Sequence, residues 1–273
     1  MKIGIASSVF VNYSLPETIQ VIAQAGFDSI DIWGGRPHVY REDFSNKELK
    51  EMRRNIEDAN LTVSSFMPAF FRYPHSLSNP NDRVRADSID YMCKCMDNAS
   101  LLGAHILLVI PGKSLHDQSL DDAKQKNLES IKILCERSES YNFYLGIEPA
   151  NRFVTDLVNT ASDAMEIISE VDHERLGVVL DTGHMNLVEE QPSESIDILG
   201  DRLLQVHVND NDGIEQQNLV PGDGVFDFQG LIDLLRQSSF SGCLSAELAW
   251  GYCSDPEPPV RLTANRLRNM LSN

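Results

Sequence analysis

Residues 175–208 read RLGVVLDTGHMNLVEEQPSESIDILGDRLLQVHV and contain the pattern from which the architecture can be predicted. Apolar runs rich in β-branched residues stand at 175–181 and 203–208, and a helix-like run begins between them near Ser193. Short runs of this kind are typical of buried strands, whereas the longer amphipathic run is typical of a helix. The segment therefore predicts two parallel strands joined by a helix.

The same alternation continues over the whole chain. The strand-like runs are 2–6, 28–33, 61–66, 105–110, 143–148, 175–181, 203–208 and 243–248. The helix-like runs begin near Ser14, Ser45, Asp82, Ser119, Thr160, Ser193, Asp227 and Pro256. Eight strands alternating with eight helices predict an α/β fold, a (β/α)8 TIM barrel that forms a single domain over residues 1–273. An open doubly wound sheet is the alternative, but neither of the common phosphate-binding glycine motifs is present.

The composition restricts the class of partner. The chain has 273 residues, and 41 acidic against 23 basic residues give a net charge of −18, which would repel a nucleic acid backbone. The longest purely apolar run, 106–110, is far shorter than the roughly 20 residues that a membrane helix needs. Five cysteines without paired spacing predict free thiols in a reducing cytoplasm. We therefore expect a cytoplasmic protein that acts on a small molecule and binds neither nucleic acid nor membrane.

The two halves of the predicted barrel differ at the carboxyl ends of their strands, where barrel enzymes carry their active sites. The first four strands end in residues that do not ionise, namely Ala6, Trp33, Phe66 and Ile110. The last four deliver ionisable side chains, namely Glu148, Asp181, His207 and Glu247. Because the strands are successive, we expect these four side chains to meet at one mouth.

Three carboxylates in one place cannot all stay ionised without a counter-charge. A divalent cation would supply it, and oxygen-rich ligation with one imidazole suits Mn²⁺ best, with Mg²⁺ or Co²⁺ as alternatives. Taken singly, each residue has a simpler interpretation. A strand-end glutamate can cap a helix or form a surface ion pair, Asp181 can form an Asx turn, and His207 can be a hydrogen-bonded core histidine. The joint pattern favours a metal site.

The order Glu, Asp, His, Glu on strands five to eight resembles the xylose-isomerase-like TIM-barrel family of sugar isomerases and epimerases. The strings IEPANRF, LDTGH, VHVND, VPGDGVFDF and SAEL agree with that resemblance, which extends over essentially the whole chain. IDIWGGRPHVY at 30–40, HVNDNDG and the tail after Glu247 resemble the fructoselysine 3-epimerase subfamily. The resemblance implies a metal-dependent enzyme of the isomerase class that forms a homo-oligomer, either a dimer or a tetramer.

The resemblance also implies roles for individual residues. Glu148, Asp181, His207 and Glu247 would bind the metal, Glu148 and Glu247 would in addition be the two acid–base groups, and His184 would contact a substrate oxygen. Two positions depart from the pattern of the ketose 3-epimerases: Val154 stands where a second glutamate is common, and Gly213 stands where the free-ketose enzymes carry an arginine. These departures leave the identity of the sugar open.

Aromatic and basic side chains follow strands two and three on the same face. Trp33 and Arg36 are predicted to contact the substrate, although a tightly packed loop with Trp33 in the core is the alternative. Phe66 is likewise predicted to contact the substrate. It begins an aromatic group that continues over 70–73, and we expect this group to cover the mouth or to meet a partner subunit.

Two glutamates facing each other across a mouth suit the inversion of a carbon next to a carbonyl, because one removes a proton and the other returns one through an enediolate. Together with this chemistry, the resemblance implies a ketose or fructosamine 3-epimerase. The alternatives are an aldose–ketose isomerase, a dehydratase of a keto-polyol in the same fold, and a non-catalytic binding protein. An endonuclease of the same fold would need a basic surface, which the charge of the chain opposes.

Overall fold

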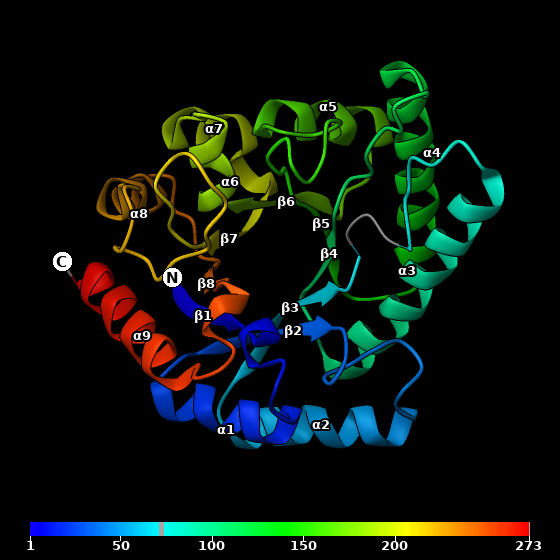
Figure 1. Ribbon diagram of the computed structural model, residues 1–273. Helices are drawn as coiled ribbons and strands as arrows, with labels where there is room; N and C mark the ends of the chain where they lie inside the picture. Colours follow the sequence, from blue (N-terminus) through cyan, green and yellow to red (C-terminus); the bar gives the residue numbers. More distant parts are fainter. Residues whose placement is uncertain (71–73, 273) are drawn as a thin grey trace.

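A computed structural model describes residues 1–70 and 74–272, and its strands form one closed, fully parallel barrel (Figure 1). The strands are β1 (Lys2–Ala6), β2 (Ser29–Gly34), β3 (Thr62–Pro68), β4 (Ile106–Val109), β5 (Tyr144–Ile147), β6 (Leu176–Asp181), β7 (Leu203–Val208) and β8 (Cys243–Ala246). Each strand pairs with the next, and β8 returns to β1. The predicted (β/α)8 barrel is confirmed.

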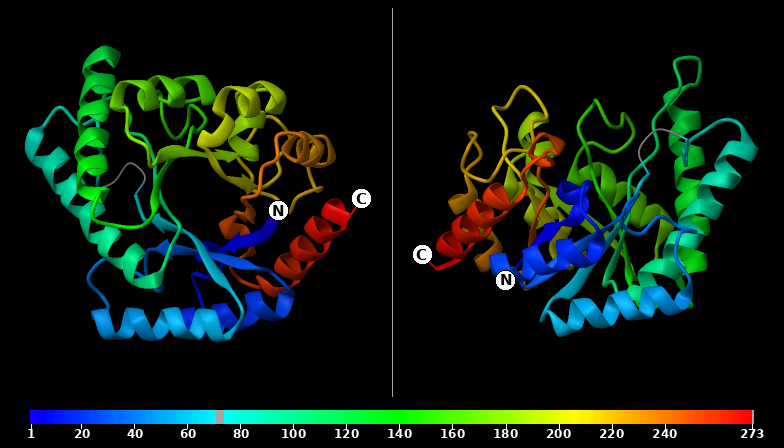
Figure 2. Two further views of the ribbon diagram at one scale, coloured as in Figure 1. Left: turned by 180° about the vertical axis from the view of Figure 1, so that it is seen from behind. Right: turned by 60° about the horizontal axis from the view of Figure 1, so that its bottom comes forward.

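The helices form an outer ring around the strands, as both views in Figure 2 show. They are α1 (Leu15–Ala25), α2 (Asn46–Asp58), α3 (Asp82–Leu102), α4 (Leu120–Ser138), α5 (Ala161–Val171), α6 (Thr182–Leu187), α7 (Pro192–Leu199), α8 (Phe228–Gln237) and α9 (Glu257–Ser272). The predicted helix starts agree with these bounds to within one residue, except that α6 was not predicted. This short helix begins directly after β6 because the Asp181 side chain accepts a hydrogen bond from the His184 backbone N–H and caps it.

The first and last strands close the barrel. Lys2 pairs with Cys243, and the ladder continues to Ile5 and Ala246. Outside this seam, α9 packs against both α1 and α8 (Figure 1). The ends of the chain therefore meet on one side of the barrel, and the last quarter of the sequence completes the sheet.

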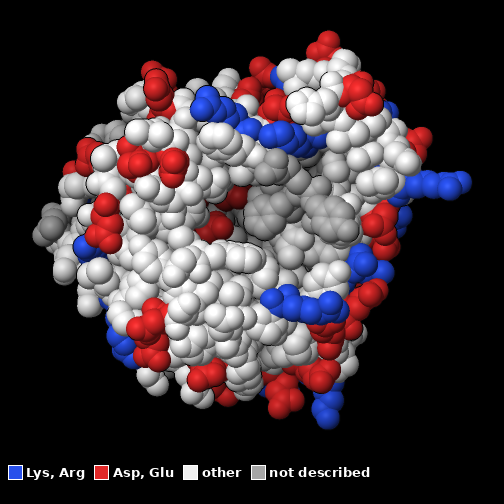
Figure 3. Space-filling model, viewed as in Figure 1, with Lys and Arg blue, Asp and Glu red and all other residues white. Residues whose placement is uncertain are grey.

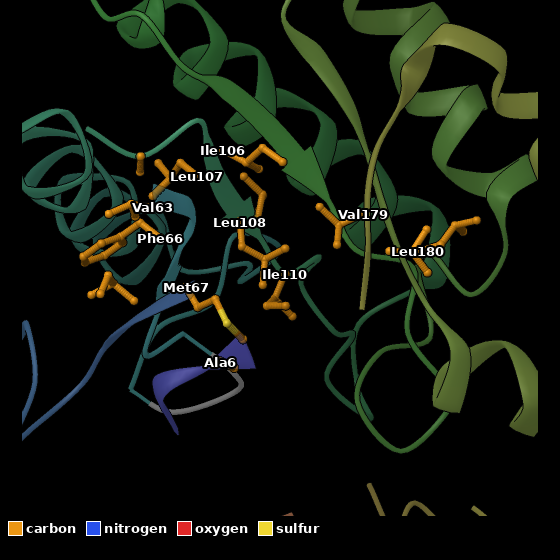
Figure 4. Packing of buried hydrophobic residues seen from close by; sticks show 14 of the residues in the cluster. Ala6, Val63, Phe66, Met67, Ile106, Leu107, Leu108, Ile110, Val179 and Leu180 are labelled. Atoms are coloured by element: carbon orange, nitrogen blue, oxygen red, sulfur yellow. The ribbon is translucent and has the colours of Figure 1, made fainter. Parts of the chain in front are cut away.

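Side chains from both faces of the strands are buried, because the helices cover the outside and the barrel fills its own interior. Ile3, Ile5, Ile30 and Ile32 have no exposed surface. Figure 4 shows part of this core, where Met67 of β3 extends towards Ala6 while Leu107, Leu108 and Ile110 come from β4 and the residue after it. The apolar strand pattern is thereby explained by burial on both sides.

Two bulges interrupt the regular pairing of the strands. Between β2 and β3, Asp31 stands opposite two residues, Ser64 and Ser65, and between β6 and β7 the residue Leu204 is inserted before Gln205. A bulge bends the strand locally and changes the direction of nearby side chains. Asp31 and Gln205 meet inside the barrel, where the Gln205 side-chain amide donates a 2.8 Å hydrogen bond to the Asp31 carboxylate.

None of the described helices is long and apolar enough to cross a membrane. All five cysteines are free, and four of them are buried. The prediction of free thiols is therefore confirmed.

Candidate metal centre and active site

The four ionisable side chains predicted at the strand ends lie together at the carboxyl end of the barrel. Glu148 and Glu247 are the first residues after β5 and β8, Asp181 is the last residue of β6, and His207 lies near the end of β7. Each offers one ligand atom, and these atoms all lie within 4.8 Å of one another. Three of the residues are buried, whereas the Glu247 side chain is about 24 % exposed and forms the open side of the cluster.

The imidazole of His207 is at the centre of this group. Its Nδ1 atom lies 2.6 Å from Oε1 of Glu148 and 3.4 Å from Oε2 of Glu247. The ring has no exposed surface. Nδ1 therefore faces the carboxylates of both glutamates.

The electrostatics of the group show that the acids compete for charge. Burial raises the pKa of Asp181, and the nearby Glu148 raises it further. Burial and the charges of Glu148 and Asp181 raise the pKa of Glu247 to about 8. Burial alone would lower the pKa of His207, but Glu148, Asp31 and Glu247 raise it well above its ordinary value. The cluster thus holds protons at neutral pH when no other cation is present.

Asp181 is fixed by two donors. The His184 backbone N–H donates to Oδ1 at 2.8 Å, and the Asn209 side-chain amide donates to Oδ2 at 2.6 Å. The bond from His184 caps helix α6 and is not the Asx turn considered for Asp181, which would use the N–H two residues further on. The cap does not compete with a ligand role, because a carboxylate has further lone pairs.

The His184 side chain lies close to the same cluster. Its Nδ1 atom is 2.9 Å from the side-chain nitrogen of Asn151, which also donates to the Gln216 side chain at 3.0 Å. His184 is about 8 % exposed and is not among the residues that line the small cavity at the two glutamates. Its contact to a substrate stays a prediction.

A small cavity opens directly above the two glutamates. Its lining consists mainly of apolar and aromatic side chains together with the two acids, namely Ser8, Trp33, Met67, Pro68, Leu108, Ile110, Glu148, Glu247 and Trp250. Trp33 and Trp250 meet edge to face with ring centroids 5.9 Å apart. Figure 3, seen from the same side as Figure 1, shows acidic side chains deep in the central hollow of the molecule.

Two of the predicted substrate contacts lie elsewhere. Arg36 forms a two-pronged ion pair with Asp43, stacks over the ring of Tyr40, and has a side chain about 68 % exposed. Phe66 is fully buried, and its ring packs against Gly34. A Cβ atom added at Gly34 would lie only 2.8 Å from the ring. Neither side chain is part of the cavity lining. The aromatic group predicted to continue over 70–73 lies outside the described residues from 71 onwards.

Several side chains of the site were not predicted as such. Asn209 and Asn151 stand in the quoted strings VHVND and IEPANRF, but their contacts depend on how two loops meet. Trp250 follows β8 and Ser8 follows β1, and only closure of the barrel brings them beside Glu247. The sequence signal for these residues was their position shortly after strands, at the end of the barrel that forms the mouth.

The donor set fits a divalent cation. Three carboxylates and one imidazole offer oxygen and nitrogen atoms in the combination that Mn²⁺, Mg²⁺ and Co²⁺ accept, and no cysteine belongs to the described cluster. The raised pKa values of Asp181 and Glu247 agree with this, because buried and crowded carboxylates are costly to ionise without a cation beside them.

The sequence pattern of the family described as xylose isomerase-like TIM barrel matches residues 19–270. The chain belongs to this family. The family predicted from the strand-end motifs is therefore confirmed.

Individual relatives agree with this assignment. Fructoselysine 3-epimerase of Escherichia coli O157:H7 is 24 % identical over 271 residues, which cover 99 % of this chain and 98 % of the relative. D-psicose 3-epimerase of Agrobacterium fabrum is 25 % identical over 239 residues, 84 % of this chain and 77 % of the relative. The crystal structure of a D-tagatose 3-epimerase-like protein superposes with a TM-score of 0.85 at 23 % identity and covers 100 % of this chain and 97 % of that one. The two relatives named as 3-epimerases belong to the isomerase class, which is the class predicted for this chain.

Proposed function

We propose that the protein is a divalent-metal-dependent sugar epimerase that inverts C3 of a ketose or of a fructosamine through an enediolate. The observation that carries this proposal is the shared position of Glu148 and Glu247, which belong to one acidic cluster and line one cavity. Epimerisation needs two proton-transferring groups on opposite faces of one carbon. The curated relatives named as 3-epimerases support the choice of reaction.

In this proposal the metal ligands are Glu148, Asp181, His207 and Glu247, with Mn²⁺ preferred and Mg²⁺ or Co²⁺ as alternatives. A divalent cation held there supplies electrostatic stabilisation of the negative charge that develops on substrate oxygens next to the reacting carbon. The Asn209 amide and the His184 backbone N–H hold the Asp181 carboxylate in place for this purpose.

The protein's own acids move the protons. One of the two glutamates removes the proton from C3, and the electron pair moves into the carbonyl to give the enediolate. The other glutamate begins protonated and gives its proton to the opposite face of C3, which inverts the centre. At the end the first glutamate is protonated and the second is ionised. Because β5 and β8 are three positions apart around the barrel, the two carboxylates approach the cavity from different sides.

Trp33 and His184 complete the proposed substrate site. The indole of Trp33 forms part of the cavity wall and offers an apolar face to the sugar's carbon skeleton, and His184 offers a ring nitrogen at the edge of the cluster. Arg36 and Phe66 are not included, because an ion pair and complete burial account for their positions.

The experiment is exchange of hydrogen for deuterium. The Mn²⁺-loaded protein is incubated in D₂O with a panel of ketoses and fructosamines, and the label is located by NMR. We expect deuterium at C3, and we expect none after chelation of the metal. Label at C1 or C2 would replace the proposal by an aldose–ketose isomerase, and a product lighter by one water would replace it by a dehydratase.

We also propose a cellular location and an oligomeric state for the enzyme. Five free cysteines support a cytoplasmic location, because thiols stay reduced there. A homo-oligomer is proposed from the family resemblance alone, and size-exclusion chromatography with light scattering tests it.

A further inference from the structure

A buried carboxylate that the proposed mechanism does not use lies inside the barrel beside His207, one of the four proposed metal ligands. Asp31 belongs to β2, in the half of the barrel that supplies none of the four ligands, and it has no exposed surface. Within residues 1–70 and 74–272 its only ion-pair partner is His207, and no lysine or arginine compensates its charge. A buried charge without such compensation is costly, so its surroundings need an explanation.

The chain holds this carboxylate firmly. The Ser64 hydroxyl donates to Oδ1 at 2.5 Å, and the Gln205 amide donates to Oδ2 at 2.8 Å. Both strand bulges lie at this network, one opposite Asp31 and one just before Gln205. The carboxylate is thereby fixed from β3 and from β7, on opposite sides of the barrel.

The ring of His207 lies between this carboxylate and the metal cluster. Its Nδ1 atom faces Glu148 and Glu247, whereas its Nε2 atom faces Oδ2 of Asp31 at 3.5 Å. Among the described residues Nε2 makes no hydrogen bond although the atom is fully buried, and the Asp31 carboxylate at 3.5 Å is its one ion-pair partner. If the ring turned over about its Cβ–Cγ bond, the carbon atoms Cδ2 and Cε1 would take the places of Nδ1 and Nε2, and the cluster would lose its nitrogen ligand. The ring therefore needs a group that fixes its orientation.

We propose that Asp31 is the positioning residue of the metal centre: its carboxylate attracts the Nε2–H of His207 and so keeps Nδ1 directed at the cation. The inference rests on the proposed metal site. A histidine ligand whose second nitrogen faces a carboxylate is held in one orientation and one tautomer, and loss of such a partner weakens metal binding by about 10- to 100-fold.

The test measures Mn²⁺ affinity by titration calorimetry at one fixed pH, with the metal alone as the probe. We expect Asp31→Ala to weaken binding by about 10- to 100-fold. Asp31→Asn keeps an acceptor oxygen and a similar volume, so we expect a loss below about 10-fold and a folded protein even if the alanine variant does not fold. Ser65→Ala is the matched control, because it removes a buried hydroxyl of the same bulge that has no hydrogen-bond partner, and its affinity should equal that of the wild type.

A second measurement separates positioning from general stability. In the protein loaded with diamagnetic Zn²⁺, ¹⁵N NMR of the His207 ring should show a protonated Nε2 and a metal-bound Nδ1, and Asp31→Asn should shift the Nε2 signal. If the wild type binds Mn²⁺ and Asp31→Asn has the same affinity and the same ring signals as the wild type, this inference is overturned while the proposed function stands. A wild-type protein that binds no Mn²⁺ would overturn the proposed function together with it.

Discussion

The first four and the last four strands form equal halves of one barrel, but they supply different chemistry to its mouth. Strands β5 to β8 deliver every member of the acidic cluster, whereas β1 to β4 and the residues after them supply most of the cavity wall, including Trp33, Met67 and Leu108. The second half therefore carries the charge, and the first half gives the cavity its shape. Asp31 of the first half also lies in the barrel interior next to His207. The division between the halves therefore holds for the side chains at the mouth and not for those in the interior.

The largest effect is expected where the two glutamates of the second half are changed. Glu247→Gln or Glu148→Gln keeps the shape of the side chain but removes its proton-accepting oxygen, so turnover should fall by about 100-fold or more while the fold persists. Initial rates on the substrate found by deuterium exchange, together with circular dichroism, measure this. Glu136→Gln on the exposed surface of α4 is the control. A fully active Glu247→Gln protein would refute the two-base mechanism.

The two halves also hold buried histidines in opposite electrostatic surroundings. Burial lowers the pKa of His38 in the first half to about 4 from an ordinary 6.5, and within residues 1–70 and 74–272 no carboxylate forms an ion pair with this ring. A folded-state pKa below the unfolded value means that stability is complete above about pH 6.5 and is lost as the pH falls towards about pH 4.

We expect the loss at His38 to reach about 3 kcal/mol of unfolding free energy. His38→Gln should make the dependence of stability on pH shallower in this range, and His116→Gln, on an exposed loop, should leave it unchanged. Urea titrations between pH 4 and 7 measure both. An identical pH dependence in the wild type and His38→Gln would contradict the assignment.

Cation binding should depend on pH because the metal-free cluster holds protons that a cation must displace. The pKa of Glu247 is about 8 in the metal-free site, so a cation must displace a proton below that pH, and Mn²⁺ affinity should rise about 10-fold per pH unit between about pH 6 and 8. By the same sign, the metal-free fold loses stability as the pH rises towards about 8, because the crowded acids become charged. Calorimetry in buffers of different ionisation enthalpy counts the released protons. Affinity that is constant over this range would contradict the raised pKa.

The smallest effect is expected at the cavity wall. Trp33→Ala removes apolar surface that binds the ground state and the transition state alike, so KM should rise about 10-fold while kcat changes little. Tyr144→Ala, an exposed aromatic at the opposite end of the barrel, is the control. Steady-state kinetics of both variants would show whether the first half contributes shape, and a kcat effect as large as that of Glu247→Gln would remove the distinction between the halves.

The fold could be predicted closely because its signals are local. Apolar runs and capping residues mark each strand and helix, and most helices begin directly after the expected serine, threonine or aspartate. The four-residue cluster could be predicted for a related reason, since strand order in a parallel barrel places consecutive strand ends side by side. The short helix α6 was not predicted, because Asp181 ends a strand and caps a helix at once.

The remaining parts of the site depend on contacts between distant segments. Trp33 and Arg36 are three residues apart in sequence, yet the first faces the cavity and the second turns outwards to Asp43, and no local pattern separates them. Asp31 lies in the middle of a strand, where its role depends on a bulge and on a residue of β7. Such pairings become visible only when the barrel closes.

The closing seam between β1 and β8 has a consequence for the order of assembly. Glu247 follows the strand that completes the sheet, so a growing chain has made three members of the cluster long before the fourth is available. A cation bound by all four residues would then link the last strand to the earlier ones, and opening of the seam would release the cation. The amount of metal that stays bound during gradual unfolding should therefore show whether the barrel is still closed.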